Sequence, residues 1–250
     1  MSIPLSVVPV VGLPEVTEGD RLGELMAGAA RLEPGDVLVV SQKVVSKAEG
    51  RVRRLAEVEP RSQARELASR LDKDPALVQA VLDESRSVIR AQEGVLITET
   101  HSGWICANAG IDASNVPEEG IVTLLPLDPD ASAQRIRSEI RGATGNAPAV
   151  VISDSFGRPW RRGQVDVAIG CAGLSPLDDW RGRRDRSGRE LTATLIALAD
   201  ELAAAADLVR DKDAGVAAAI VRGFGERVSD DDDGPGAASI QRPSEDDLFR

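Results

Sequence analysis

The chain has 250 residues, of which 42% are hydrophobic and 2% aromatic, and it contains no tyrosine. This length and composition suffice for a well-buried core of Val, Leu, Ile and Ala, in one large domain or two small lobes. The formal net charge of −11 argues against nonspecific binding to DNA or RNA.

Two cysteines, Cys106 and Cys171, lie far apart and form no C-x-x-C pattern. This usage predicts reduced, half-buried thiols in a cytoplasmic protein. The N-terminus shows no targeting signal, and no apolar run approaches the roughly 20 residues that a membrane-spanning helix needs. We therefore expect a cytoplasmic protein with no membrane partner and no nucleic-acid partner.

Apolar runs and helical spacing predict the elements in chain order: a strand at 3–11, a helix at 20–32, a strand at 37–40, helices at 61–71 and 75–84, strands at 87–90, 95–98, 104–106 and 121–125, a helix at 131–141, a strand at 149–152, a helix at 190–209 and a strand at 216–221. Strands and helices mix without a clean β-α-β alternation. The order therefore predicts an α+β fold with mixed, largely antiparallel sheets.

We expect residues 1–250 to form one domain of two intimately joined lobes. The acidic, Pro- and Gly-containing segment 228–246 is predicted to be mobile, with Leu248 and Phe249 as a docking point for the tail. The sequence shows no internal repeat and no long linker.

Several standard chemistries are missing from the sequence. There is no G-x-x-x-x-G-K-[ST] motif, and no G-x-G-x-x-G follows a predicted strand. His101 is the only histidine, which excludes zinc sites built on His and Cys clusters and leaves no evident Ser-His-Asp triad. The remaining inventory of carboxylates, hydroxyls, Lys and Arg fits phosphoryl transfer with Mg²⁺ or Mn²⁺.

The segment 153–164 follows the apolar strand at 149–152 and is predicted to be a Gly- and Arg-rich loop. Asp154 and Ser155 offer hard oxygen ligands for a cation, and nearby arginines offer positive charge for anions. Residues 154–190 hold eight arginines and six acids, which suggests a local pocket for a small polyanion. The alternatives are a surface turn after a core strand and a solvated loop with internal salt bridges.

Two further polar segments stand beside predicted strands. Residues 41–50 contain Lys43 and Lys47, and residues 108–116 contain Asp112, followed by Ser114 and Asn115. Taken alone, a lysine such as Lys47 is more often a solvated surface lysine. Asp112 taken alone is equally consistent with an Asx-turn carboxylate that caps its own backbone. The combination of the three segments is more specific than any one of them.

The motifs at residues 9–15, 44–50, 109–116, 152–161, 222–225 and 247–249 together resemble the coenzyme F-420 γ-glutamyl ligases, which act on the precursor of a deazaflavin cofactor. The resemblance covers almost the whole chain. It implies an unusual intertwined dimeric ligase fold and a homodimer. Some relatives append a nitroreductase-like domain; because the chain ends at Arg250, we expect the single-domain form.

The resemblance also implies site residues. It assigns nucleotide binding to Leu13, Pro14, Glu15, Val16, Gln42, Lys47 and Asn115, and metal binding to Asp112, Asp154 and Ser155. It implies GTP as co-substrate, Mg²⁺ or Mn²⁺ as two ions, and K⁺. Many relatives carry a glutamate after the long helix as a second-metal ligand. Here the stretch contains Asp211 and Asp213 instead, either of which could substitute.

The implied reaction is GTP-dependent addition of L-glutamate to the deazaflavin precursor coenzyme F-420-0 through an acyl phosphate, with no covalent nucleophile on the protein. Arg158, Arg161 and Arg162 are candidates to bind anionic groups of the precursor. Further γ-linked glutamates could follow the first. The alternatives are a ligase of the same mechanism with another carboxylic acid, and a non-catalytic nucleotide-binding homologue.

Overall fold

The computed structural model describes residues 4–114, 119–231 and 234–247. Its centre is a five-stranded sheet in the order β1 (Ser6–Val10), β12 (Ala218–Arg222), β2 (Val37–Ser41), β8 (Ala149–Arg158) and β9 (Arg161–Ala172). Within this sheet β2 and β8 run parallel, with Val37 opposite Ala149, and the other neighbours are antiparallel. The predicted α+β class with mixed, largely antiparallel sheets is confirmed.

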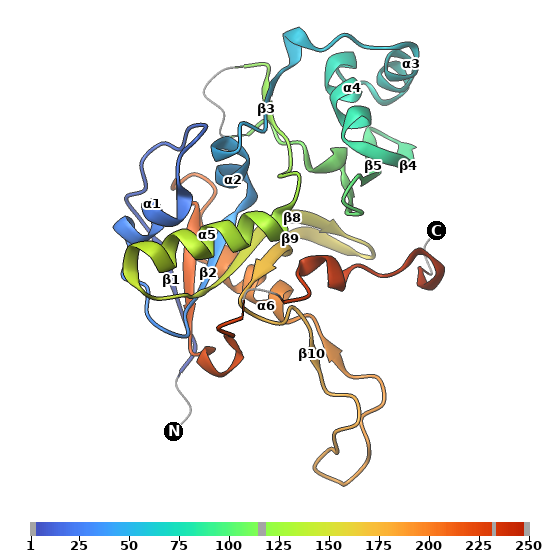
Figure 1. Ribbon diagram of the computed structural model, residues 1–250. Helices are drawn as coiled ribbons and strands as arrows, with labels where there is room; N and C mark the ends of the chain where they lie inside the picture. The colour runs from blue at the N-terminus through green and yellow to red at the C-terminus, as the bar shows by residue number, and fades with distance from the viewer. Residues whose placement is uncertain (1–3, 115–118, 232–233, 248–250) are drawn as a thin grey trace.

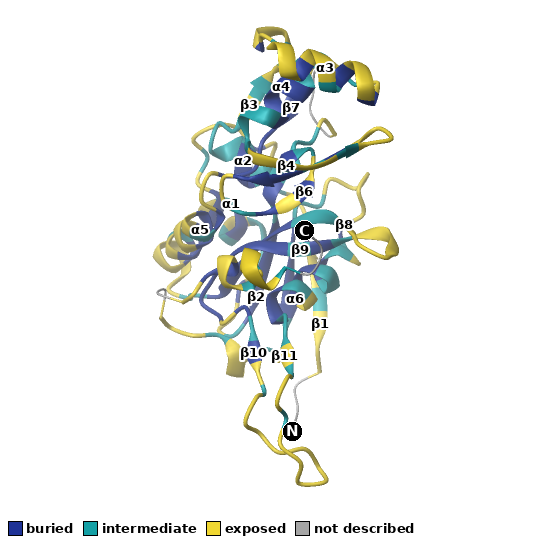
Figure 2. Ribbon diagram, turned by 90° about the vertical axis from the view of Figure 1, so that its right-hand side faces the viewer, coloured by how far each residue is buried: buried dark blue, intermediate teal, exposed yellow. Residues whose placement is uncertain are grey.

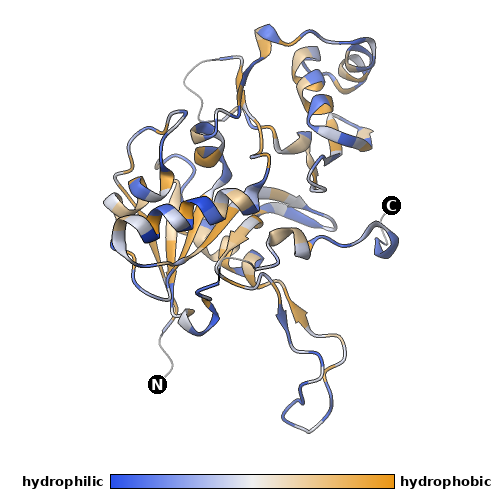
Figure 3. Cartoon of the chain, viewed as in Figure 1, coloured by the Kyte–Doolittle hydropathy of each residue, from blue (hydrophilic) through white to orange (hydrophobic). Residues whose placement is uncertain are grey.

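Helices cover both faces of this sheet. Residues 37–40 of β2 and 149–152 of β8 are at most 1% exposed, so consecutive side chains are buried on both sides of each strand. Helices α1 (Leu22–Ala29) and α5 (Pro129–Thr144) pack on one face, and α6 (Leu198–Asp207) packs on the other (Figures 1 and 2). The apolar strands between these layers form the main core (Figure 3).

Two glycines set how closely α5 approaches its neighbours. A Cβ on Gly23 would lie 2.4 Å from the carbonyl oxygen of Ile136 in α5, and a Cβ on Gly170 would lie 2.3 Å from the carbonyl oxygen of Pro129. The Asp128 side chain caps the N-terminus of α5 by accepting a 3.0 Å hydrogen bond from the Ala131 amide.

A second lobe has its own small core. It consists of α3 (Ser62–Leu71), α4 (Pro75–Asp83) and a sheet of β4 (Ser85–Gln92), β5 (Val95–Thr100) and β6 (Ile105–Ala107). Its buried cluster includes Ala64, Leu71, Val78, Val81 and Leu96. A two-stranded sheet of β3 (Val52–Arg54) and β7 (Ile121–Thr123) connects it to the main lobe. Among the described residues, every helix is too short or too polar to span a lipid bilayer.

The predicted loop at 153–164 is wrong. β8 continues through Arg158, and β9 begins at Arg161, so the segment is the outer part of a hairpin that turns at Pro159 and Trp160. The strand β9 was not predicted at all. Its first half is polar and exposed, and it becomes apolar only where it enters the core, so no uniform pattern marks it.

The predicted helix at 190–209 is too long, and one helix was missed. α6 begins at Leu198, because Leu195 and Ile196 form β11, which pairs with β10 (Asp178–Asp179). Residues 180–194 between these short strands extend away from the body as an arm (Figure 1).

The missed helix is α2 (Gln42–Ala48), which follows β2 directly. Its cap is Ser41, which accepts a 3.4 Å hydrogen bond from the Lys43 amide.

The described residues of the segment 228–246 contact the main lobe. The Ser229 amide donates to the carbonyl of Gly173 at 2.7 Å, and the Ala237 amide donates to Asp130 Oδ1 at 2.7 Å. Ala237 is fully buried. The mobility of the segment stays a prediction, and Leu248 and Phe249 lie outside the described residues.

Candidate functional site

A pocket of about 710 Å³ lies where the parallel pairing of β2 with β8 ends, at Ser41 and Ser153, and where the main lobe meets the second lobe. Parallel strands that end at one edge leave a crevice beyond their carboxyl ends, which is where open α/β sheets bind ligands. The walls come from the loop after β1, the start of α2, the loop after β6, the hairpin β8–β9 and the loop after α6.

The fold brings most of the predicted site residues to this pocket. Those that line it are Leu13, Pro14, Glu15, Val16, Gln42, Lys47, Asp112, Asp154 and Ser155. Asp211 and Asp213, the alternatives for a second metal, line it as well. Arg158, Arg161 and Arg162 are exposed at the outer end of the hairpin and are not part of the lining. Asn115 lies outside the described residues.

Helix α2 presents two lysines to the pocket, one turn apart. Lys47 Nζ lies 2.6 Å from Glu15 Oε1 of the loop after β1, and Lys43 Nζ lies 3.0 Å from Asp112 Oδ2. Both lysine side chains are mostly buried, with 14% and 15% exposed. An ammonium held at the wall of a pocket is a suitable point charge for a phosphate group.

Asp112 has local partners that resemble those of an Asx turn. The Ser114 amide donates to Asp112 Oδ1 at 2.6 Å, and the Ser114 hydroxyl donates to Oδ2 at 3.0 Å. Burial raises the pKa of Asp112, but the hydrogen bonds from Ser114 and the ammonium of Lys43 outweigh it and hold the pKa below its usual value. The carboxylate is therefore ionised at neutral pH, as a metal ligand must be.

Asp154 stands at the end of the buried part of β8. Burial raises the pKa of its carboxyl to about 7, and the nearby carboxylates of Asp166 and Asp112 add to the rise, against the lowering effects of the Ser155 amide and Lys212. The charge of this carboxylate is thus incompletely balanced by protein cations. Such a group favours a bound cation.

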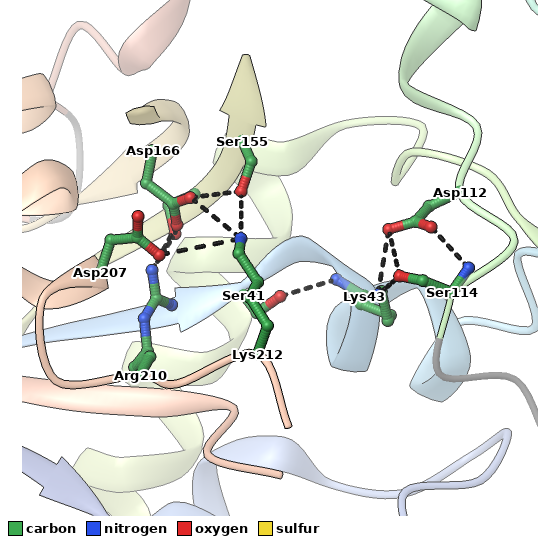
Figure 4. A network of polar contacts seen from close by, with 10 residues as sticks. Ser41, Lys43, Asp112, Ser114, Ser155, Asp166, Asp207, Arg210 and Lys212 are labelled. Atoms are coloured by element: carbon green, nitrogen blue, oxygen red, sulfur yellow. Dashed lines mark hydrogen bonds and ion pairs between the residues drawn. The ribbon is translucent and has the colours of Figure 1, made fainter. Parts of the chain in front are cut away.

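Sequence reasoning missed the buried pair at the floor of the pocket. The register of the hairpin places Asp166 of β9 opposite Ser155, and the Ser155 and Ser153 hydroxyls donate to its two oxygens at 2.6 and 2.9 Å. Arg210, from the loop after α6, forms an ion pair with Asp166 and donates to the Ser153 hydroxyl at 2.9 Å (Figure 4). Both charged side chains are about 95% buried.

A recognised strand at 161–172 would have revealed Asp166, because a lone acid in an otherwise apolar strand interior needs a partner. Arg210 gave no such signal, because it sits in an irregular loop.

The donor set fits a magnesium or manganese ion. Asp112, Asp154 and Ser155 offer only hard oxygen donors, and Mg²⁺ commonly uses one or two carboxylates together with substrate phosphates. Within residues 4–114, 119–231 and 234–247, however, no three His, Cys, Asp or Glu side chains form a ready metal-binding group. An ion here would therefore complete its coordination with nucleotide oxygens or water.

A comparison with protein families decides the assignment. A family model described as "F420-0:Gamma-glutamyl ligase" matches residues 11–223. The chain belongs to this family of ligases. The resemblance drawn from the motifs is confirmed, and the match spans every wall of the pocket.

Curated relatives named coenzyme F420:L-glutamate ligase align with the chain over most of its length. The protein of Methanothermobacter thermautotrophicus is 46% identical over 254 residues, covering 98% of this chain and 99% of the relative. That of Archaeoglobus fulgidus is 48% identical over 221 residues, with 88% of each chain covered. That of Methanopyrus kandleri is 45% identical over 247 residues, with 98% of each covered.

Proposed function

We propose that this protein is a GTP-dependent ligase that joins L-glutamate through an amide bond to the deazaflavin precursor coenzyme F-420-0. The observation that carries the proposal is the pocket. It gathers two lysines, several carboxylate and hydroxyl oxygens and the loop after β1 in one place, in a chain of the F-420-0 ligase family. The names of the curated relatives support the same substrates.

In this proposal the nucleotide lies along α2. Lys47 and Lys43 bind phosphate oxygens, and their present partners Glu15 and Asp112 hold them at the pocket wall until the nucleotide arrives. Leu13, Pro14, Val16 and Gln42 contact the rest of the nucleotide, and Asn115, which lies outside the described residues, is a further nucleotide-binding residue. Gln42 is held in place by a 2.9 Å hydrogen bond that its Oε1 accepts from the Ser46 hydroxyl.

A divalent cation, when bound by Asp112, Asp154 and Ser155, would neutralise charge on the phosphate oxygens. An oxygen of the acceptor carboxylate attacks the γ-phosphorus of GTP, and GDP leaves. The glutamate nitrogen then attacks the carbonyl carbon of the acyl phosphate, phosphate leaves, and the amine loses a proton. The protein's part is positioning and electrostatic stabilisation.

No protein nucleophile is required, and Cys106 is unsuited to be one. Its side chain lines the pocket, but burial, and to a lesser degree the charge of Asp154, raise the pKa of its thiol to about 12. The thiol stays protonated at neutral pH and is a poor nucleophile.

Arg158, Arg161 and Arg162 extend beyond the pocket at the exposed end of the hairpin β8–β9. Gly157 and Gln164 of the same hairpin line the pocket. We infer that these arginines bind anionic groups of the acceptor that protrude from the pocket.

We further propose that the protein acts as a cytoplasmic homodimer, with a second copy of this chain as partner, Mg²⁺ or Mn²⁺ as cofactor and K⁺ as an additional ion. The arm at residues 180–194 extends from the body and offers a surface for such a partner. Light scattering during size exclusion should give twice the chain mass. A measured mass equal to that of one chain would contradict this part of the proposal.

The reaction is tested by incubating the protein with GTP, Mn²⁺, coenzyme F-420-0 and L-glutamate. We expect GDP and a product heavier by one or more glutamate residues, and neither when the acceptor is omitted. GDP release with other carboxylic acids but not with F-420-0 would favour a ligase of the same mechanism that acts on a different carboxylic acid. Absence of GDP release with every acid would favour a non-catalytic homologue and contradict the proposal.

A further inference from the structure

Trp160 stands at the tip of the hairpin β8–β9 with most of its indole ring in solvent. It is the most exposed large apolar side chain among the described residues, at 87%. The chain has only three tryptophans, three phenylalanines and no tyrosine, and Trp104, by contrast, lies in the main core. A large aromatic ring left in water forgoes the free energy that its burial would give. The exposure of Trp160 therefore needs an explanation other than core packing.

The backbone at Trp160 is also unfavourable for this residue type. Arg158 of β8 pairs with Arg161 of β9, so Pro159 and Trp160 form a two-residue turn. Trp160 has a φ of 64°, in the left-handed region that favours glycine or asparagine and disfavours a bulky side chain. Strained residues of this kind cluster at functional sites. Because glycine would suit the turn better, the indole ring is the part of Trp160 that needs a role.

The hairpin carries Trp160 outward from the pocket (Figure 1). Ser155, Phe156 and Gly157 line the pocket, and the chain then leaves it toward the tip. At roughly 3.3 Å per strand residue, the tip lies about 10–15 Å from Ser155. A compound that lies along the hairpin with its reacting group at Ser155 therefore reaches Trp160 with its opposite end.

Positive charge surrounds the indole ring. Arg158, Arg161 and Arg162 are exposed at the same tip, and Arg158 Nη2 donates to the carbonyl oxygen of Arg162 at 3.2 Å, across the turn. An aromatic ring among guanidinium groups suits a ligand that is both flat and anionic, because the rings stack while the guanidinium groups pair with anionic oxygens. A deazaflavin acceptor has this character, with a planar aromatic ring at one end and its reactive carboxylate at the other.

We propose that Trp160 is a substrate-binding residue that stacks on the deazaflavin ring, while the carboxylate at the other end of the acceptor reacts at Asp154 and Ser155. The proposal rests on the proposed function for the identity of the acceptor. The three arginines recognise the charge of the acceptor, and Trp160 recognises its flat ring. Stacking needs a planar π-face and no particular substituent, so an acid without such a ring should bind more weakly.

The test is the binding of coenzyme F-420-0 in the presence of GDP and Mn²⁺, without glutamate, followed by calorimetry and by deazaflavin fluorescence. Trp160→Gly removes the indole ring and suits the turn, and it should weaken F-420-0 binding at least about fivefold. Trp160→Phe keeps an aromatic ring and should stay within about threefold of the wild type. The wild type should quench the deazaflavin fluorescence, and Trp160→Gly should not.

The matched control is Leu127→Ala, which shortens another apolar side chain, 74% exposed and outside the pocket lining. It should bind F-420-0 like the wild type, and GDP affinity should be the same in every variant. An F-420-0 affinity of Trp160→Gly within about twofold of the wild type would overturn the proposal. So would an equal loss of GDP affinity in Trp160→Gly, which would mean a distorted pocket.

Two further outcomes would overturn the role of Trp160. One is a wild type that does not bind F-420-0. The other is a dimeric wild type with a monomeric Trp160→Gly variant in light scattering, which would place the indole ring at a subunit interface. The binding measurement involves no turnover. A protein that binds F-420-0 with Trp160-dependent quenching but forms no glutamyl product would contradict the proposed reaction and leave the role of Trp160 supported.

Discussion

Asp166 and Arg210 form an ion pair that is shielded from solvent beneath the pocket. Removing two charges from water is costly, and such a pair is stable only when further hydrogen bonds satisfy it. Asp166 has these from Ser153 and Ser155, but Arg210 Nε and Nη1 have no hydrogen-bond partner among the described residues. Hydrogen bonds therefore compensate only part of the cost of burying the pair, and each charge needs the other as its counter-ion.

Asp166→Asn should lower the free energy of unfolding by about 3–5 kcal/mol, because it leaves the Arg210 charge buried without a counter-ion. Urea unfolding followed by circular dichroism measures the change. Adding Arg210→Met to this variant should recover part of the loss, since the unpaired charge is then gone. A loss below about 1 kcal/mol for the single variant would show that the pair contributes little.

Cys106 provides a test of the proposed route through an acyl phosphate. Because the pKa of its thiol is raised to about 12 by burial, the thiolate is scarce below that pH and becomes appreciable only as the pH approaches 12. Cys106→Ser should keep glutamate-dependent GDP release within about twofold of the wild type. Loss of turnover in a folded Cys106→Ser variant would point to a covalent intermediate on sulfur.

At the level of elements, the sequence predicts best those segments with a uniform pattern. The apolar runs at 37–40 and 149–152 became β2 and β8, and the predicted helix at 131–141 is the central part of α5. The hairpin end of β8 and the whole of β9 were missed, because they are formed by cross-strand pairing of polar residues. Local propensity carries little information about such pairing.

The same contrast between local sequence pattern and tertiary contact explains which site residues could be predicted. Asp112, Asp154 and Lys47 could be predicted because each belongs to a motif of adjacent residues that the family resemblance assigns to the site. Asp166 and Arg210 could not, since their meeting depends on the register of β8 with β9 and on the path of the loop after α6. The second-metal region was the least predictable, because Lys212 acquires its partners only through the tertiary fold.

Gly23 and Gly142 give a matched pair of helix substitutions. Gly23→Ala should destabilise the protein by about 1–3 kcal/mol, because its Cβ would lie 2.4 Å from the Ile136 carbonyl oxygen and force α1 away from α5. Gly142→Ala in α5 meets nothing within 4 Å and should stabilise it by about 0.5–1 kcal/mol. Denaturant unfolding gives the free energy of unfolding of each variant. An equal change in this free energy for the two variants would contradict the close packing of α1 on α5.

For the whole molecule, the pocket is shared between two lobes that have separate hydrophobic clusters. The lysines of α2 belong to the main lobe, whereas Asp112 follows the β-sheet of the second lobe. Contacts such as Lys43 with Asp112 cross between them. A ligand that fills the pocket should therefore stabilise both lobes together, by about 2.7 kcal/mol at a hundredfold excess over its dissociation constant.

Hydrogen exchange with and without GDP and Mn²⁺ tests this coupling. We expect slower exchange in the loop 11–16 and in α2, and also in residues 108–114 of the second lobe. The control is α3, which lies away from the pocket and should change little. Protection confined to the main lobe would mean that the second lobe does not take part in binding.

The central claim is that Asp112 and Asp154, from different lobes, act on one nucleotide during amide formation. Glutamate-dependent GDP release by Asp112→Asn and Asp154→Asn tests it most directly. The account predicts that each variant folds like the wild type but loses more than about 100-fold in rate. Rates near that of the wild type in either variant would contradict it.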